Sequence, residues 1–163
     1  MPTIRPATLA DHEAIWQMFH PILATGDTYV LAPDRPREEV LAYWFPPKGH
    51  VFVAEHDGKV IGSSLIKPNQ PGLGDHVANG AFIVAPESRG LGVGRLLGEH
   101  ALQEARRLGF RAMQFNFVVS TNTGAIELWK KLGFEIVGTL PRAYRHARLG
   151  EVDAYIMFRP LDD

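Results

Sequence analysis

The chain of 163 residues has 45% hydrophobic and 21% charged residues, as in an ordinary folded protein, and we expect a single domain over residues 1–163. Its 17 basic and 18 acidic side chains are mixed along the chain, which argues against a nucleic-acid partner. The sequence has no cysteine, which excludes disulfides, thiolate metal ligands and a cysteinyl acyl-enzyme. Its seven histidines show no metal-ligand spacing, no apolar run approaches the ~18 residues of a membrane span, and the N-terminus lacks a secretory signal. We therefore expect a cytoplasmic protein without a metal and without a membrane partner.

Apolar periodicity, caps and helix breakers predict strands and helices in alternation. Thr8 and Asp11 form a capping-box pair that opens the first helix, Pro36 favours the start of a second, and Asp57-Gly58 predicts a hairpin. In chain order we expect a strand at 3–5, helices at about 8–25 and 36–45, strands at 51–55, 59–66 and 81–84, a helix at 93–108, a strand at 113–119, a helix at 122–132, and strands at 134–139 and 152–158, the last two connected by a polar, arginine-rich segment at 141–149.

Helix follows strand twice in the second half of the chain, an arrangement that permits adjacent parallel strands, whereas the hairpin is antiparallel. The order of elements shows no repeat and no linker. It therefore predicts one α/β (α+β) domain around a mixed central sheet.

A glycine-rich stretch, RGLGVGR over residues 89–95, follows the apolar run that ends at Val84. Alternating glycines let backbone N–H groups converge, and the N-terminus of the next helix adds partial positive charge, so the stretch predicts a pyrophosphate site flanked by Arg89 and Arg95. It lacks the Gly-Lys-Ser/Thr of a nucleotide-triphosphate loop and the G-x-G-x-x-G spacing of a dinucleotide site. The alternative is a strand-to-helix turn that merely needs glycine.

The pattern R-x-x-G-x-G resembles the acyl-CoA pyrophosphate loop of the GCN5-related N-acetyltransferases (GNAT). One strand and one helix further on, NTGAIELWKKLGF at 122–134 resembles the second signature of that family, N-x-x-A-x-x-L-Y-x-K-x-G-F, at all positions but one. The two motifs together cover Val84 to Phe134. The resemblance implies the GNAT fold, with about four helices and a sheet of about six to seven strands that splays around the acyl-CoA site, and it implies an N-acetyltransferase that uses acetyl-CoA.

The same resemblance implies roles for single residues. The N–H groups of 91–95 would hold the pyrophosphate, the end of the strand at Val84 would supply N–H donors to the thioester oxygen, and Asn122 would contact the cofactor arm. The implied acyl-CoA contacts are Ile83, Val84, Arg89, Gly90, Leu91, Gly92, Val93, Gly94, Arg95, Asn122 and Trp129.

Trp129 is the one departure from the second signature. Many family members have a tyrosine there that protonates the departing thiolate, and an indole N–H is no acid at neutral pH. Trp129 also shares a helical stripe with apolar residues and suits a core position. The acid is then Tyr144, Tyr155, Ser120 or water, or the thiolate leaves unaided, and we take Asn122 and Tyr144 as the candidate catalytic residues.

Three stretches, KPNQPG, HVANGAF and FNFVV, resemble the proline-analogue (azetidine-2-carboxylate) N-acetyltransferases. That likeness implies that Asn79 and Asn116 bind the substrate carboxylate, with Phe82 beside them. Asparagine is depleted in strands, so each amide needs a partner, which can be a ligand, the backbone exposed where two strands separate, or a β-bulge. Asn122 equally suits the N-cap of a helix, and His76 suits either a structural role or proton transfer through water.

The predicted function is direct transfer of an acetyl group from acetyl-CoA to the amine of a small molecule, and a proline-like imino acid is the predicted acceptor. Other acceptors would keep the chemistry: a free amino acid of the phosphinothricin or methionine-sulfoximine kind, a polyamine, or a protein N-terminus. A non-catalytic acyl-CoA sensor is the alternative of another class, and Trp129 is its one indication. Strand edges near the C-terminus are compatible with a homodimer.

Overall fold

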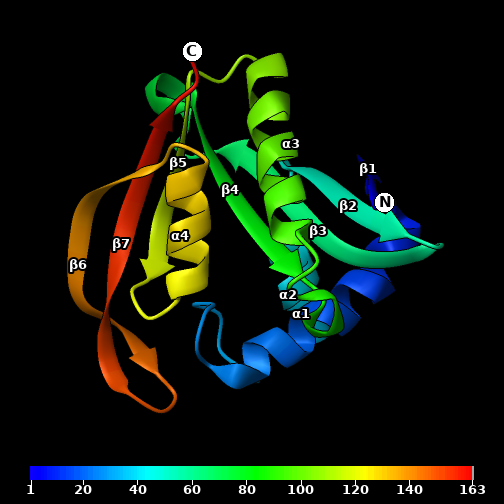
Figure 1. The fold of residues 1–163 in the computed structure, drawn as a ribbon, viewed down its shortest axis with the longest axis horizontal. Coiled ribbons are helices and arrows are strands. Elements are labelled where there is room, and N and C mark those ends of the chain that lie inside the picture. Colours follow the sequence, from blue (N-terminus) through cyan, green and yellow to red (C-terminus); the bar gives the residue numbers. More distant parts are fainter. Residues whose placement is uncertain (163) are drawn as a thin grey trace.

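In the computed structural model, which describes residues 1–162, the chain folds around one seven-stranded mixed sheet with four α-helices (Figure 1). The strands, in chain order, are β1 (Thr3–Pro6), β2 (His50–His56), β3 (Lys59–Pro68), β4 (Val77–Val84), β5 (Ala112–Val119), β6 (Glu135–His146) and β7 (Gly150–Pro160). The helices are α1 (His12–Thr25), α2 (Arg37–Trp44), α3 (Val93–Arg107) and α4 (Thr123–Lys131), and short 3-10 turns form η1 (Leu9–Asp11), η2 (Gly72–Gly74) and η3 (Pro86–Ser88). These elements confirm the expected fold class.

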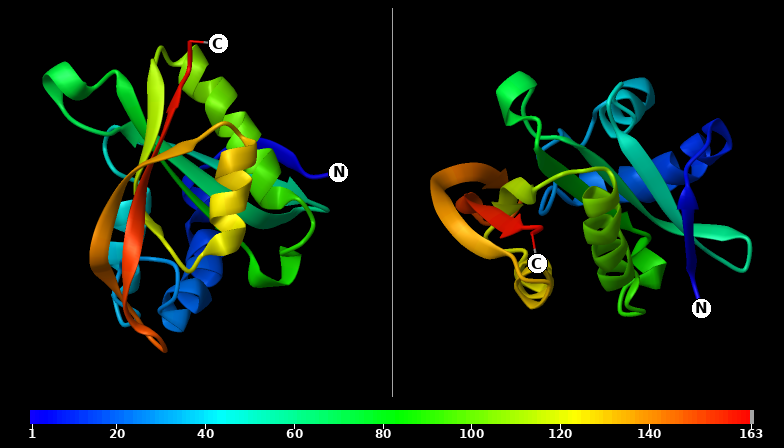
Figure 2. Two further views of the ribbon diagram at one scale, coloured as in Figure 1. Left: turned by 60° about the vertical axis from the view of Figure 1, so that its left-hand side comes forward. Right: turned by 90° about the horizontal axis from the view of Figure 1, so that it is seen from above.

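The strands lie in the order β1-β2-β3-β4-β5-β7-β6. Only β4 and β5 pair in parallel within residues 1–162, and α3 is the crossover between them. Helices α3 and α4 cover one face of the sheet, and α1 and α2 cover the other (Figure 2). The centre of the sheet is therefore a parallel pair enclosed by helices on both sides.

Buried apolar side chains fill both faces of the sheet. The core on the side of α1 and α2 includes Ile15, Phe19, Leu23, Val40, Trp44, Val53 and Leu65, whereas that on the side of α3 and α4 includes Ala101, Leu102, Met113, Phe115, Trp129 and Met157. The indole N–H of the buried Trp44 is satisfied by a hydrogen bond, because Nε1 donates to Ser63 Oγ at 2.9 Å. No helix in the described part of the chain has the length and apolar character that crossing a membrane requires.

The N-terminal capping box is confirmed, with one correction to the helix that it opens. The backbone N–H of Thr8 donates to Asp11 Oδ2 at 2.7 Å. Residues 9–11 form the 3-10 turn, however, and α1 begins at His12. Asp11 also accepts from both terminal nitrogens of Arg5 at 2.9 Å, and these hydrogen bonds lower the pKa of its carboxyl. The cap therefore ties α1 to the edge strand.

Most strands are longer than the sequence predicts, β4 and β6 above all. β4 begins at Val77 rather than Ala81, and residues 141–146 of the predicted connection at 141–149 belong to β6, leaving only 147–149 as the turn before β7. β6 lies at the edge of the sheet opposite β1, and most of its side chains are exposed, so charged residues are tolerated there and mask the alternating pattern of a strand. Two register shifts, after Ile136 and after Leu140, interrupt its alternation further.

Candidate active site

The parallel strands at the centre of the sheet pair over a short stretch and then separate. Residues 77–79 of β4 pair with 112–114 of β5, and beyond that point each strand continues for five residues without pairing to the other. A bulge between Phe115 and Val118 interrupts the pairing of β5 with β7 and bends β5. Figure 1 shows β4 and β5 diverging toward their carboxyl ends. The backbone of both strands is thereby opened to a ligand at the middle of the sheet.

The glycine stretch after β4 borders a groove of about 770 Å³ on one side of this opening. Gly90 has φ 84° and Gly92 has φ 78°, left-handed values that favour glycine. Gly92 caps α3, and the first N–H that donates within that helix belongs to Leu96. The N–H groups of 93–95 have no hydrogen-bond partner within residues 1–162, and these three residues line the groove. The groove thus offers an anion the start of a helix and its free donors.

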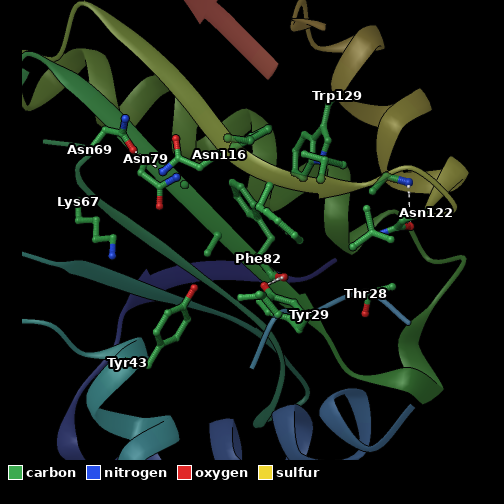
Figure 3. Close-up of a pocket in the computed structure, with 18 residues that line it drawn as sticks. Thr28, Tyr29, Tyr43, Lys67, Asn69, Asn79, Phe82, Asn116, Asn122 and Trp129 are labelled. Carbon is green, nitrogen blue, oxygen red and sulfur yellow. Dashed lines mark hydrogen bonds between the residues drawn. The ribbon is translucent and has the colours of Figure 1, made fainter. Parts of the chain in front are cut away.

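A second cavity of about 290 Å³ lies in the opening itself (Figure 3). Its apolar floor includes Phe82 and Trp129, whose ring centroids are 4.8 Å apart. The cavity and the groove share five lining residues: Thr28, Tyr29, Phe82, Asn122 and Ala125. We name the smaller one the acceptor cavity, since it adjoins the groove without containing the glycine stretch. Two ligands bound in the two hollows would meet near these shared residues.

The acetyltransferase (GNAT) family model matches residues 14–134, which is most of the chain. This chain belongs to the GNAT family. N-acetyltransferase aca1 of Schizosaccharomyces pombe is 43% identical to this chain in an alignment of 148 positions that covers 80% of this chain and 71% of that relative.

Solved structures of the family agree with the fold of this GNAT protein. A GCN5-related N-acetyltransferase from Kribbella flavida superposes with a TM-score of 0.93 at 43% identity, over 98% of this chain and 97% of that one. YncA from Salmonella typhimurium, solved with its cofactor acetyl-CoA, has a TM-score of 0.87 at 26% identity, over 100% of this chain and 95% of that one. The protein is accordingly an N-acetyltransferase that depends on acetyl-CoA.

Most of the residues that the sequence predicts to contact acetyl-CoA line the groove. Nine of the eleven, all except Leu91 and Trp129, line it. Leu91 is 69% exposed at the tip of the glycine loop. The side chain of Arg95 pairs with Glu99 at 2.8 Å, so its positive charge is partly neutralised, whereas Arg89 makes no ion pair within residues 1–162. The backbone donors and Arg89 together suit a pyrophosphate.

Asn79 and Asn116 both line the acceptor cavity, and each amide already has protein partners. Asn79 Nδ2 donates to the carbonyl of Gln114 at 3.0 Å, at the last paired position before the strands separate. Asn116 Nδ2 donates to Asn69 Oδ1 at 2.7 Å, and its Oδ1 accepts from Gln114 Nε2 at 2.8 Å. Asn79 therefore satisfies backbone that is exposed where the two strands separate, whereas Asn116 bonds only side chains and lies in the bulge of β5 between Phe115 and Val118. Both of these non-ligand roles are thus observed, one at each asparagine.

Asn122 and Trp129 come from α4 and its cap. Asn122 Oδ1 accepts from the backbone N–H of Ala125 at 3.4 Å, so the N-cap role is observed, and Asn122 also lies at the junction of cavity and groove. Trp129 is 8% exposed and packs against Phe115 and Phe134. Trp129 lies in the core and at the floor of the acceptor cavity, not in the groove.

Tyr144 lines neither hollow. Its hydroxyl donates to the carbonyl of Tyr29 at 2.9 Å, and burial raises its pKa, which makes it a poorer acid. Tyr29 in turn donates to the carbonyl of Phe82 at 2.5 Å. The backbone N–H of Ala147 donates to the carbonyl of Gly26 at 3.0 Å. Tyr144 thus anchors the loop after α1 through Tyr29 and does not line the junction of cavity and groove.

The other candidates for proton transfer also lie away from the acceptor cavity. Ser120 and Tyr155 line neither hollow, and His76 lines a neighbouring hollow that shares Lys67 and Asn69 with the acceptor cavity. Within residues 1–162 no cluster of three histidine, aspartate or glutamate side chains could hold a metal ion.

Several cavity residues were assigned no role from the sequence, among them Thr28, Tyr29, Tyr43, Lys67 and Asn69, although the last two lie in the KPNQPG stretch. They lie on the loop after α1, on α2 and at the end of β3, elements outside both signatures. Lys67 and Asn79 are cross-strand partners, so alternation along β3 and β4 could have placed Lys67 beside Asn79. Nothing in the local pattern could have placed Tyr29 or Tyr43, because their position depends on tertiary packing.

Proposed function

We propose that this GNAT enzyme transfers the acetyl group directly to the amine of a small acceptor held in the acceptor cavity, and that proline-like imino acids are the acceptor class. The observation that carries the proposal is the meeting of cavity and groove at Tyr29, Phe82 and Asn122. A cavity of about 290 Å³ is at the small end of ligand sites, which favours an acceptor of amino-acid size over a protein N-terminus. We also propose that residues 1–163 act as a single domain, because every strand described belongs to one sheet.

In this reaction the neutral amine nitrogen attacks the thioester carbon. The C–N bond forms, the C–S bond breaks, the nitrogen gives up its N–H proton to water, and the sulfur leaves as thiolate and takes up a proton from water. The backbone of β4 beyond Asn79 is free of β5 and can donate to the thioester oxygen as it becomes negative. Holding the two reactants together in adjoining hollows supplies proximity, and the residues shared by the hollows set their orientation.

The proton of the acceptor amine has to leave before attack, since aliphatic amines have pKa values of about 10. The lining of the acceptor cavity, within the described residues, includes no carboxylate and no imidazole. We propose that the amine loses its proton to water. The departing thiolate can likewise take its proton from water, so a tryptophan at position 129, where many family members carry a tyrosine, is compatible with catalysis. Turnover distinguishes the enzyme from a non-catalytic sensor.

The test is turnover by the purified protein. Acetyl-CoA is incubated with L-proline, L-azetidine-2-carboxylate, free amino acids, diamines and peptides, while released CoA thiol is measured and the acetylated product is identified by mass spectrometry. The proposal predicts release with small amino or imino acids and little with peptides. Asn79→Ala and Asn116→Ala should raise the KM for these acids. No release above the rate of acetyl-CoA hydrolysis with any acceptor would contradict the proposed function.

A further inference from the structure

We infer that Lys67 makes this enzyme selective for acceptors that carry a carboxylate, which it pairs at the end of the acceptor cavity away from the groove. The inference rests on the proposed function and names the charge that its acceptor must carry. The prediction from sequence gave that role to Asn79 and Asn116. Both are uncharged, and each is already engaged with a protein partner.

The lining of the acceptor cavity carries a net positive charge. Among the 18 lining residues, Lys67 has the only side chain that is charged at neutral pH. The two tyrosines, Tyr29 and Tyr43, stay neutral because burial raises the pKa of each hydroxyl. A lone cation in a concave, partly apolar site attracts an anion and repels a cation. The lining thus disfavours polyamines and favours acids.

The ammonium of Lys67 contacts an aromatic ring and forms no ion pair with an acidic side chain of the described residues. It is half-buried near the end of β3, and its ammonium lies 5.7 Å from the centre of the Tyr43 ring, a cation–π contact that fixes the side chain. No aspartate or glutamate within the described residues lies within 4.0 Å of its Nζ. The nearest acidic residue among those that share a hollow with it is Asp75, across the neighbouring hollow. The ammonium therefore keeps its capacity to bind an external acid.

Amide groups surround the same end of the cavity. Lys67 and Asn79 are partners across β3 and β4, and Asn116 lies on the same face of the sheet by strand alternation. The Asn116–Asn69 hydrogen bond uses Asn69 Oδ1 as acceptor, which leaves the Asn69 amide N–H groups available to donate. Figure 3 shows Lys67, Asn69, Asn79 and Asn116 together at one end and Asn122 with Thr28 at the other. A carboxylate at the first end would direct the rest of the acceptor toward the groove.

The decisive experiment compares an acid with its amide in wild type and in Lys67→Met. The methionine keeps an unbranched side chain that is one atom shorter, and it removes the charge. We use L-proline and L-prolinamide with saturating acetyl-CoA, and we take the ratio of their kcat/KM values within each protein, which cancels differences in folding. Comparing this acid-to-amide ratio between proteins also cancels the difference in amine basicity of the two substrates. Lys67→Met should lower the ratio by about 10- to 100-fold relative to wild type, through KM rather than kcat.

Two variants serve as controls. Lys67→Arg keeps the charge and should retain most of the preference for the acid. Lys48→Met removes a lysine that lines only the neighbouring hollow, and it should leave the ratio unchanged. An equal loss with acid and amide in Lys67→Met, which leaves their ratio as in wild type, would overturn the inference while the proposed acetyl transfer stands.

Equilibrium binding separates the two proposals. If no acceptor is turned over, the proposed function fails, and calorimetric titration of L-proline into the complex with CoA still decides the role of Lys67. Binding that weakens at least tenfold in Lys67→Met, but not in Lys48→Met, supports the carboxylate site. Binding that is absent in the wild type, or equal in both variants, contradicts it.

Discussion

Substitution of Gly92 by alanine separates the structural need for glycine from its role at acetyl-CoA. A Cβ at Gly92 would meet no atom within 4 Å, so the change causes no clash. Its cost comes from φ of 78°, a left-handed value that costs a residue with a side chain about 1–2 kcal/mol. Relief of that strain would turn the N–H groups of 93–95 away from the groove. Loss of one charge-assisted hydrogen bond, about 1.5–3 kcal/mol, corresponds to a rise of about 10- to 100-fold in the KM for acetyl-CoA.

Gly109→Ala is the matched control for Gly92→Ala. Gly109 has φ of 91°, a Cβ there would also meet no atom within 4 Å, and the residue follows the opposite end of α3. Urea unfolding should show a similar loss of about 1–2 kcal/mol for both variants, whereas only Gly92→Ala should weaken acetyl-CoA. Equal KM values for acetyl-CoA in the two variants would refute the assignment of the free N–H groups to the pyrophosphate.

Three further substitutions test individual contacts. Tyr144→Phe should lower the free energy of unfolding by about 1 kcal/mol, through the lost hydrogen bond to Tyr29, and change kcat less than twofold; a tenfold fall in kcat would instead support a role as acid. Trp129→Ala should lower the free energy of unfolding by about 3–5 kcal/mol in a urea titration, because the indole is buried among aromatic rings, and a loss below about 1 kcal/mol would contradict that. Asp11 has a pKa below its usual value because of Arg5, so its stabilisation is complete above about pH 4 and is lost as the pH falls through the lower folded pKa. Asp11→Asn should remove that part of the acid dependence of stability, and an unchanged dependence would contradict it.

The fold was predictable where residues close together in the sequence determine the local backbone conformation by themselves. The glycine stretch needs left-handed backbone at Gly90 and Gly92 whatever surrounds it, and Asn122 caps its helix through an amide only three residues from its partner. The length of β6 was not predictable in this way. It is an edge strand with an exposed face, and pairing with β7 rather than burial of its side chains determines where it ends.

The residues of the acyl-CoA groove were easier to predict from the sequence than those of the acceptor cavity. The groove is bordered largely by one continuous segment after β4, so its residues are neighbours in sequence. The acceptor cavity takes Tyr29, Tyr43 and Lys67 from three separate elements. Trp129 was placed among the acetyl-CoA contacts from its motif, whereas packing puts it at the floor of the acceptor cavity. Long-range packing, which motif spacing does not encode, determines these positions.

The central claim is that the acceptor binds in the opening between β4 and β5, next to acetyl-CoA but apart from it. Asn116→Trp tests this most directly, because Asn116 is exposed, lines the acceptor cavity and does not line the groove. Gln103→Trp, at an exposed position on α3, is the control. With the best acceptor from the panel, Asn116→Trp should lose most of its turnover while calorimetry gives an acetyl-CoA affinity equal to that of wild type and of Gln103→Trp. Unchanged turnover in Asn116→Trp would contradict the placement of the acceptor.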